Sequence, residues 1–102
     1  MKIATMVGYW SSGPPADAAQ VFATADELRF DQVWTAEAYG SDAWTPLAWW
    51  GSRTSHVHLG TAVSQLSARP PATLAMAAMT MDHLTQGRVL LVSLCPRMAL
   101  PL

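Results

Sequence analysis

The sequence predicts an α/β fold built on a parallel sheet, and three observations support this. Four short segments have the near-continuous hydrophobicity of strands buried on both faces. Three stretches with helical spacing lie between them, and a chain of 102 residues has room for one small domain at most. Strands that alternate with helices are typical of right-handed βαβ units. The expected strands are Lys2 to Gly8, Gln32 to Glu37, Val57 to Val63 and Arg88 to Leu94.

Each expected helix has its own start signal. The first follows Pro14 and Pro15, has Asp17 in its first turn, and carries apolar residues at helical spacing. These are Ala18, Val21, Phe22, Ala25 and Leu28.

The second helix has Ser41 or Asp42 as a plausible N-cap. Its expected inner face is formed by Ala43, Leu47, Trp50 and Gly51. The third helix starts at Pro70 and Pro71 and ends near Gln86 and Gly87, where a glycine stop is expected. Its expected inner face is formed by Leu74, Ala75, Ala78, Met81 and Leu84.

The glycine pattern favours a (β/α)8 TIM barrel over a doubly wound nucleotide-binding sheet. The first turn reads GYWSSGPP and contains neither G-x-G-x-x-G nor G-x-x-x-x-G-K-[ST], so both phosphate-binding fingerprints are missing there. We therefore expect the chain to cover about the first three and a half βα units of such a barrel. Residues 1–94 would form this partial barrel, and residues 95–102 an aberrant tail.

Composition narrows the function classes. Lysine and arginine number six against seven acidic residues, and no basic cluster occurs, so we expect no nucleic-acid partner. No apolar run approaches the roughly 18 residues of a membrane span, and the lone Cys95 suits a reducing compartment, so we expect a cytoplasmic protein. Only 13% of residues are charged, against about 25% in typical domains. We expect self-association or a partner subunit to cover part of the apolar surface.

Three motifs resemble the amino-terminal half of the luciferase-like oxidoreductases, the family of bacterial luciferase and the coenzyme F420-dependent reductases and dehydrogenases. They are FDQVWTAEAYG at the second strand, HLGTAVSQL at the third, and RPPATLAMAAMTMDHLTQGR across the third helix. All three occur in order, and the resemblance covers residues 1 to about 88. The resemblance is closest to the F420-dependent members.

The resemblance implies hydride transfer between a small organic substrate and a deazaflavin, coenzyme F420, with the flavin FMN as the alternative. It also implies that the cofactor lies at the carboxyl ends of the strands. In the family, the third strand often contains a bulge with a non-prolyl cis peptide under the cofactor ring, and the matching residues are Ala62 and Val63. Glu37 matches a carboxylate near the cofactor, while Ala38 stands where some relatives have a histidine.

Two departures from the family pattern matter. Arg29 replaces a glycine that commonly ends the first helix in a left-handed conformation. After Arg88 the family pattern runs into a glycine- and serine-rich loop, but this chain has VLLVSLCPRMALPL. We therefore expect a truncated or frameshifted product that is inactive alone. The alternative from another class is a non-catalytic remnant or subunit that acts by association.

Other residues have a structural and a functional interpretation. His56 and His58 have a metal-ligand spacing that would suit a hydrolase, but they open the third strand, so we expect no metal site. Trp10 follows the first strand and could line a substrate pocket. Met76, Met79 and Met81 are expected to pack, and His83 to be solvated. For Cys95 we expect no nucleophilic role.

Overall fold

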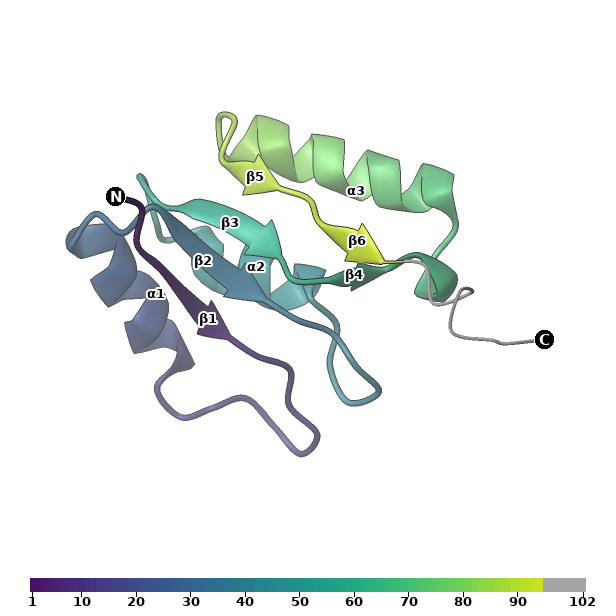
Figure 1. The fold of residues 1–102 in the computed structure, drawn as a ribbon, viewed down its shortest axis with the longest axis horizontal. Coiled ribbons are helices and arrows are strands. Elements are labelled where there is room, and N and C mark those ends of the chain that lie inside the picture. Colours follow the sequence, from purple (N-terminus) through teal and green to yellow (C-terminus); the bar gives the residue numbers. More distant parts are fainter. Residues whose placement is uncertain (95–102) are drawn as a thin grey trace.

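The computed structural model describes residues 1–94, and the expected tail, with Cys95, lies outside the described residues. The main sheet has four parallel strands in the order β1-β2-β3-β5. Their bounds are Ala4–Val7, Gln32–Thr35, His58–Thr61 and Val89–Leu90. A small parallel sheet pairs β4 (Ser64–Gln65) with β6 (Ser93–Leu94). The helices are α1 (Ala18–Glu27), α2 (Trp44–Gly51) and α3 (Pro71–Leu84), with a short 3₁₀ turn at Leu66–Ala68. The alternation of strands and helices that the sequence predicts is confirmed (Figure 1).

The strands are shorter than expected, and the last predicted strand is divided. Val57 to Val63 becomes β3 alone, and a separate strand that the sequence did not predict, β4, begins just after it at Ser64. Arg88 to Leu94 becomes β5 and β6, because residues 91 and 92 leave the main sheet before the chain pairs with β4. The sheet thus opens at the carboxyl ends of β3 and β5.

One face of the main sheet packs against the three helices. The register aligns Val33 with Leu59 and Thr35 with Thr61, and all four side chains are buried on this face. Phe22 of α1, Leu47 of α2 and Leu74 of α3 complete the core. The core therefore forms one continuous layer between sheet and helices.

The other face of the sheet is open in the described part of the chain, so burial on both faces was a wrong expectation for these strands. Met6 is 54% exposed and is aligned with Trp34 and Gly60. The indole of Trp34 lies over Gly60, where a Cβ would collide with the ring. In a barrel this face would point inward.

Three residues that the helical pattern placed on inner faces are exposed: Leu28, Ala75 and Leu84. Met76 and Met79 are also exposed, and of the three methionines on α3 only Met81 is buried. On α3 the cause is that a surface helix buries only a narrow stripe, on which Leu74 and Met81 lie.

The turns agree with the sequence-based predictions more closely than the strand ends and the burial do. Arg29 has a φ of 60°, so the left-handed conformation persists without the glycine, and Phe30 N–H donates to the Ala25 carbonyl at 2.8 Å. The expected stop after α3 contains two left-handed residues, Gln86 and Gly87. Asp42 Oδ2 accepts hydrogen bonds from the N–H groups of Trp44 and Thr45, both at 3.0 Å, and so caps α2.

Asp26 fastens α1 to the loop before β3. Its carboxylate accepts from the backbone N–H groups of Ser55, His56 and Val57 at 3.0, 2.7 and 3.0 Å. Partial burial raises the pKa of Asp26, but these three hydrogen bonds and the charge of His56 lower it, and the net pKa lies below the ordinary value of 3.8. The charged carboxylate therefore stabilises the folded chain.

This arrangement predicts a pH-dependent stability difference between the wild type and Asp26→Asn. A depressed folded-state pKa contributes stability above the unfolded pKa, and this contribution is lost as the pH falls through the folded value. We expect Asp26→Asn to have the lower Tm at pH 7, and the difference to shrink below about pH 4. Thermal unfolding followed by circular dichroism from pH 7 to pH 3 measures it. A Tm difference that stays constant over this range would contradict the prediction.

Candidate functional site at the carboxyl ends of the strands

Glu37 lies just beyond β2, and its side chain is only 5% exposed. Oε1 accepts from the Ala43 N–H at 3.0 Å and faces Arg69 Nη2 at 3.3 Å, while Oε2 accepts from the Gln65 N–H. One carboxylate thus joins the end of β2, the start of α2, β4 and the loop before α3. Both oxygens are engaged within the protein, which makes Glu37 a scaffold residue of this end of the sheet.

Ala62 and Val63 form a ledge between β3 and β4, and the peptide bond that joins them is cis, as the resemblance implied. The ledge is held from both sides. Ala62 N–H donates to the Thr35 carbonyl at 2.6 Å, and Ser64 N–H donates to the Val92 carbonyl at 2.9 Å. The hydroxyl of the buried Ser64 accepts from Trp44 Nε1 at 3.1 Å.

The ledge fits one face of a planar ring system. Ala62 and Val63 are both partly exposed, and their side chains are small and apolar. At the end of β1, two strands away from β3, Gly8 has no atom within 4 Å of the position that a Cβ would take. A flat aromatic cofactor needs an apolar, rigid support, and Ala62 and Val63 could supply it on one face.

Sequence reasoning found the positions of Glu37, Ala62 and Val63 but missed their partners. Arg69 and Gln65 contact Glu37 across 32 and 28 residues of sequence. The only sequence signal for Arg69 was a cation placed directly before the proline start of a helix. Ala38, at the position where relatives have a histidine, makes a backbone bridge with Ser41 and offers no side-chain chemistry.

Trp10 lies on the helix side of the strand ends. Its ring packs edge-to-face against Trp50 of α2, with ring centroids 5.9 Å apart and planes at 64°. The structure therefore brings Trp10 to α2, and no contact joins it to the ledge among the described side chains. A role in a substrate pocket stays a prediction.

The two histidines with metal-ligand spacing, His56 and His58, lie at the opposite end of the sheet. His56 is in the loop before β3 and His58 is the first residue of β3, and both side chains are exposed. Within residues 1–94, no group of three or more His, Cys, Asp or Glu side chains could hold a metal ion. His83 is exposed near the end of α3, as expected.

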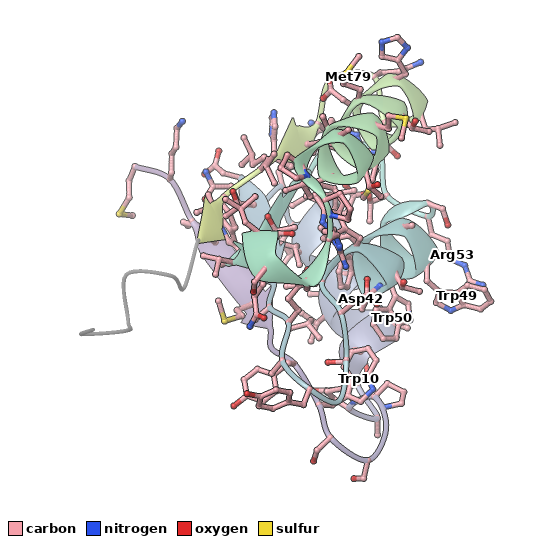
Figure 2. The ribbon with its side chains drawn as sticks, turned by 90° about the vertical axis from the view of Figure 1, so that its right-hand side faces the viewer. Trp10, Asp42, Trp49, Trp50, Arg53 and Met79 are labelled. Carbon is pink, nitrogen blue, oxygen red and sulfur yellow. The ribbon has the colours of Figure 1, made fainter. Side chains whose placement is uncertain are left out.

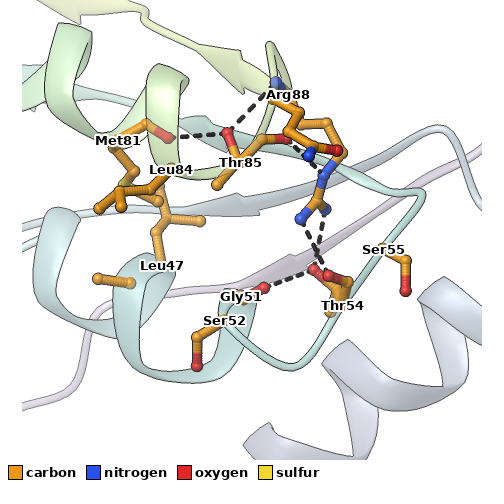
Figure 3. Close-up of a pocket in the computed structure, with 11 residues that line it drawn as sticks. Leu47, Gly51, Ser52, Thr54, Ser55, Met81, Leu84, Thr85 and Arg88 are labelled. Carbon is orange, nitrogen blue, oxygen red and sulfur yellow. Dashed lines mark hydrogen bonds between the residues drawn. The ribbon is translucent and has the colours of Figure 1, made fainter.

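A cavity of about 440 Å³ lies at this amino-terminal end, between α2 and α3 (Figure 3). Arg88 crosses it and donates to the carbonyls of Thr54, Val57 and Thr85 at 2.9, 2.7 and 3.0 Å. A further bond from Nη1 reaches Thr54 Oγ1 at 3.0 Å. The guanidinium is almost fully hydrogen-bonded within the protein, so Arg88 joins the segment before β3 to the turn after α3.

Comparison with known proteins supports the fold. The chain is 57% identical over 91 residues to a Mycobacterium tuberculosis protein named for coenzyme F420-dependent oxidoreductase activity, which covers 89% of this chain and 26% of the relative. It is 35% identical over 98 residues to the F420-dependent glucose-6-phosphate dehydrogenase of Amycolatopsis mediterranei, covering 83% of this chain and 29% of that enzyme. The chain thus spans about a quarter to a third of these relatives.

Among solved structures, monooxygenase RslO1 from Streptomyces bottropensis superimposes with a TM-score of 0.76 at 28% identity, over 91% of this chain and 32% of that one. The parallel sheet and its helices correspond to an amino-terminal part of a (β/α)8 barrel. No helix in residues 1–94 is long and apolar enough to cross a membrane. A family model described as luciferase-like monooxygenase matches residues 2–92. The chain belongs to the luciferase-like monooxygenase family.

Proposed function

We propose that this chain forms one wall of the cofactor site of an oxidoreductase that transfers a hydride between a small organic substrate and coenzyme F420. The anchored ledge of Ala62 and Val63, at the carboxyl ends of the parallel strands, carries the proposal. The names of two curated relatives favour F420 over FMN. When bound, the deazaflavin would supply the hydride chemistry.

The residues of this chain would bind and orient. Ala62 and Val63 would support one face of the ring, and the hydrogen bonds of Thr35 and Val92 to the flanking amides keep that support in place. Glu37 and Arg69 would act indirectly, because their ion pair fixes the loops on either side of the ledge. We place the reaction in the cytoplasm.

Cofactor binding can be tested on the purified chain with the backbone amides as reporters. We expect F420 to shift the amide signals of Ala62, Val63 and Ser64 saturably in ¹⁵N–¹H correlation spectra, and FMN to shift them less. The Arg88 amide, at the opposite end of the sheet, is the internal control and should stay unchanged. We expect no turnover, because the chain supplies one wall of the site. Shifts that spare the ledge, or that spread equally to Arg88, would exclude this role.

A second candidate function is association through the open face of the sheet. Large apolar side chains are exposed here and on the segments flanking the strands, including Ile3, Met6, Leu91 and Val92, and contiguous apolar surface invites partners. Light scattering coupled to size-exclusion chromatography distinguishes cofactor binding from association. A monomer that melts cooperatively and binds F420 would count against a purely associative role, whereas a stable oligomer without cofactor binding would support it.

A further inference from the structure

A cavity of about 360 Å³ lies between the β1–α1 loop and α2, on the helix side of the sheet. We call it the tryptophan cavity. Figure 2 shows Trp10, Asp42, Trp49 and Trp50 gathered on this side of the molecule. Its walls combine these four residues with Gly40, Ser41 and a few neighbours. Three of the five tryptophans of the chain therefore line this one cavity.

The walls of the tryptophan cavity are held by contacts among the residues that line it and by Phe22 behind Trp50. Trp10 N–H donates to Ser41 Oγ at 2.8 Å, and the β1–α1 loop approaches so closely that a Cβ at Gly40 would collide with it. Trp50 packs on Phe22, with ring centroids 5.7 Å apart, and supports the edge of Trp10. A ligand would therefore meet preformed aromatic walls and would lose little affinity to ordering them.

The charge of the tryptophan cavity indicates that its ligand would be a cation. Of the described residues that line it, Asp42 alone is charged. Its Oδ2 caps α2 and lies 3.7 Å from Arg69, but that pair is weak because the Asp42 side chain is 37% exposed. Oδ1 makes no hydrogen bond within residues 1–94. Aromatic faces attract cations through their quadrupole, and a single carboxylate adds to that attraction.

We propose that the tryptophan cavity binds the ammonium group of a small organic cation. Tryptophan is the strongest of the aromatic side chains in such contacts. The volume is near the lower end of small-molecule pockets, which run from about 300 to 1,000 Å³, so it suits a compact ligand better than an extended peptide. The exposed ring of Trp49 would close over the ligand from the solvent side. This site is independent of the cofactor ledge.

Choline and its uncharged isostere 3,3-dimethylbutan-1-ol form a matched pair of probes. They share shape and hydroxyl and differ in the charge. The readout is the indole N–H signals of the five tryptophans in ¹⁵N–¹H spectra of the full chain, assigned by single Trp→Phe variants. We expect choline to shift the signals of Trp10, Trp49 and Trp50 saturably. Trp34 and Trp44, whose indole N–H groups are bonded to Gln32 and Ser64, are internal controls.

Three variants refine the test. Trp49→Leu removes an exposed ring but keeps an apolar side chain, and we expect choline to bind about fivefold more weakly. Asp42→Asn keeps a capping oxygen for α2 and removes the charge, and we expect a loss of the same size, about fivefold, for choline and none for the alcohol. Tyr39→Leu changes an exposed aromatic residue that does not line the cavity, and it should leave binding unchanged.

The outcomes are decisive in both directions. Saturable choline shifts confined to the three indoles, with weaker binding to both cavity variants, support a cation site. Equal shifts by the two probes would show an apolar cavity without cation selectivity and would overturn the proposal. So would choline shifts that include Trp34 and Trp44, or no shift at all. Loss of folding in Asp42→Asn would leave Trp49→Leu, on the protein surface, to decide.

Discussion

Replacing Phe22 with alanine is expected to lower the free energy of unfolding by about 3–5 kcal/mol. Phe22 is 1% exposed and belongs to the core layer between α1 and the sheet. Its ring also supports Trp50, which α2 contributes. Because domains are stable by only about 5–15 kcal/mol, this single change should remove much of the stability of so small a chain. Urea unfolding followed by circular dichroism measures the loss.

Leu28→Ala is the matched control, since it lies just after the same helix and also removes a large apolar side chain. Leu28 is 64% exposed, so the change should alter the free energy of unfolding by no more than about 0.5 kcal/mol. The helical pattern had placed Leu28 on the buried face. An equal loss in both variants would show that α1 packs differently from the structure described above.

The order of strands and helices was predictable because its signals are local. Apolar runs, proline starts and glycine stops each depend on a few neighbouring residues, and Asp42 and Gly87 act as expected. Strand ends were less predictable. The small strand β4 and the division of the last predicted strand both depend on the pairing of β4 with β6, 29 residues apart in register, and no local pattern reports it.

Burial was overestimated on the sheet and on α3 for the same reason. Hydrophobicity reports the environment for which a side chain is suited, but it does not say which segment provides the cover. Met6 on the sheet and Met79 on α3 are equally apolar, and both are more than half exposed. The pattern on β1 agrees with an inward-facing barrel strand, and the chain spans only 26% to 29% of its curated relatives.

The candidate site was predicted in part because family motifs fix positions rather than contacts. The motif placed Ala62, Val63 and Glu37 at the strand ends, which is where the structure has them. It could not show that both carboxylate oxygens of Glu37 are bonded within the protein, because Arg69 and Gln65 approach Glu37 from a different βα unit. We therefore propose that Glu37 positions the ledge, and its contact with the cofactor stays a prediction.

Replacing Glu37 with glutamine should therefore lower the free energy of unfolding by about 2–4 kcal/mol. The neutral amide can accept from only one of the two backbone N–H groups, at Ala43 or Gln65, and its own NH₂ faces the other. Arg69 also loses the closer of its two carboxylate partners, and Asp42 remains at 3.7 Å. The backbone N–H group that is left without an acceptor costs more than the net value of the original bond.

Amide hydrogen exchange identifies which residues lose protection when Glu37 is replaced. In Glu37→Gln we expect the amides of Ala43 and Gln65 to exchange faster than in the wild type, while the Val57 amide, held by Asp26, keeps its protection. Arg69→Met should destabilise less, because Glu37 keeps both backbone donors. If the two variants lose equal stability and exchange at Gln65 is unchanged, the carboxylate does not hold the ledge, and a direct contact of Glu37 with the cofactor regains support.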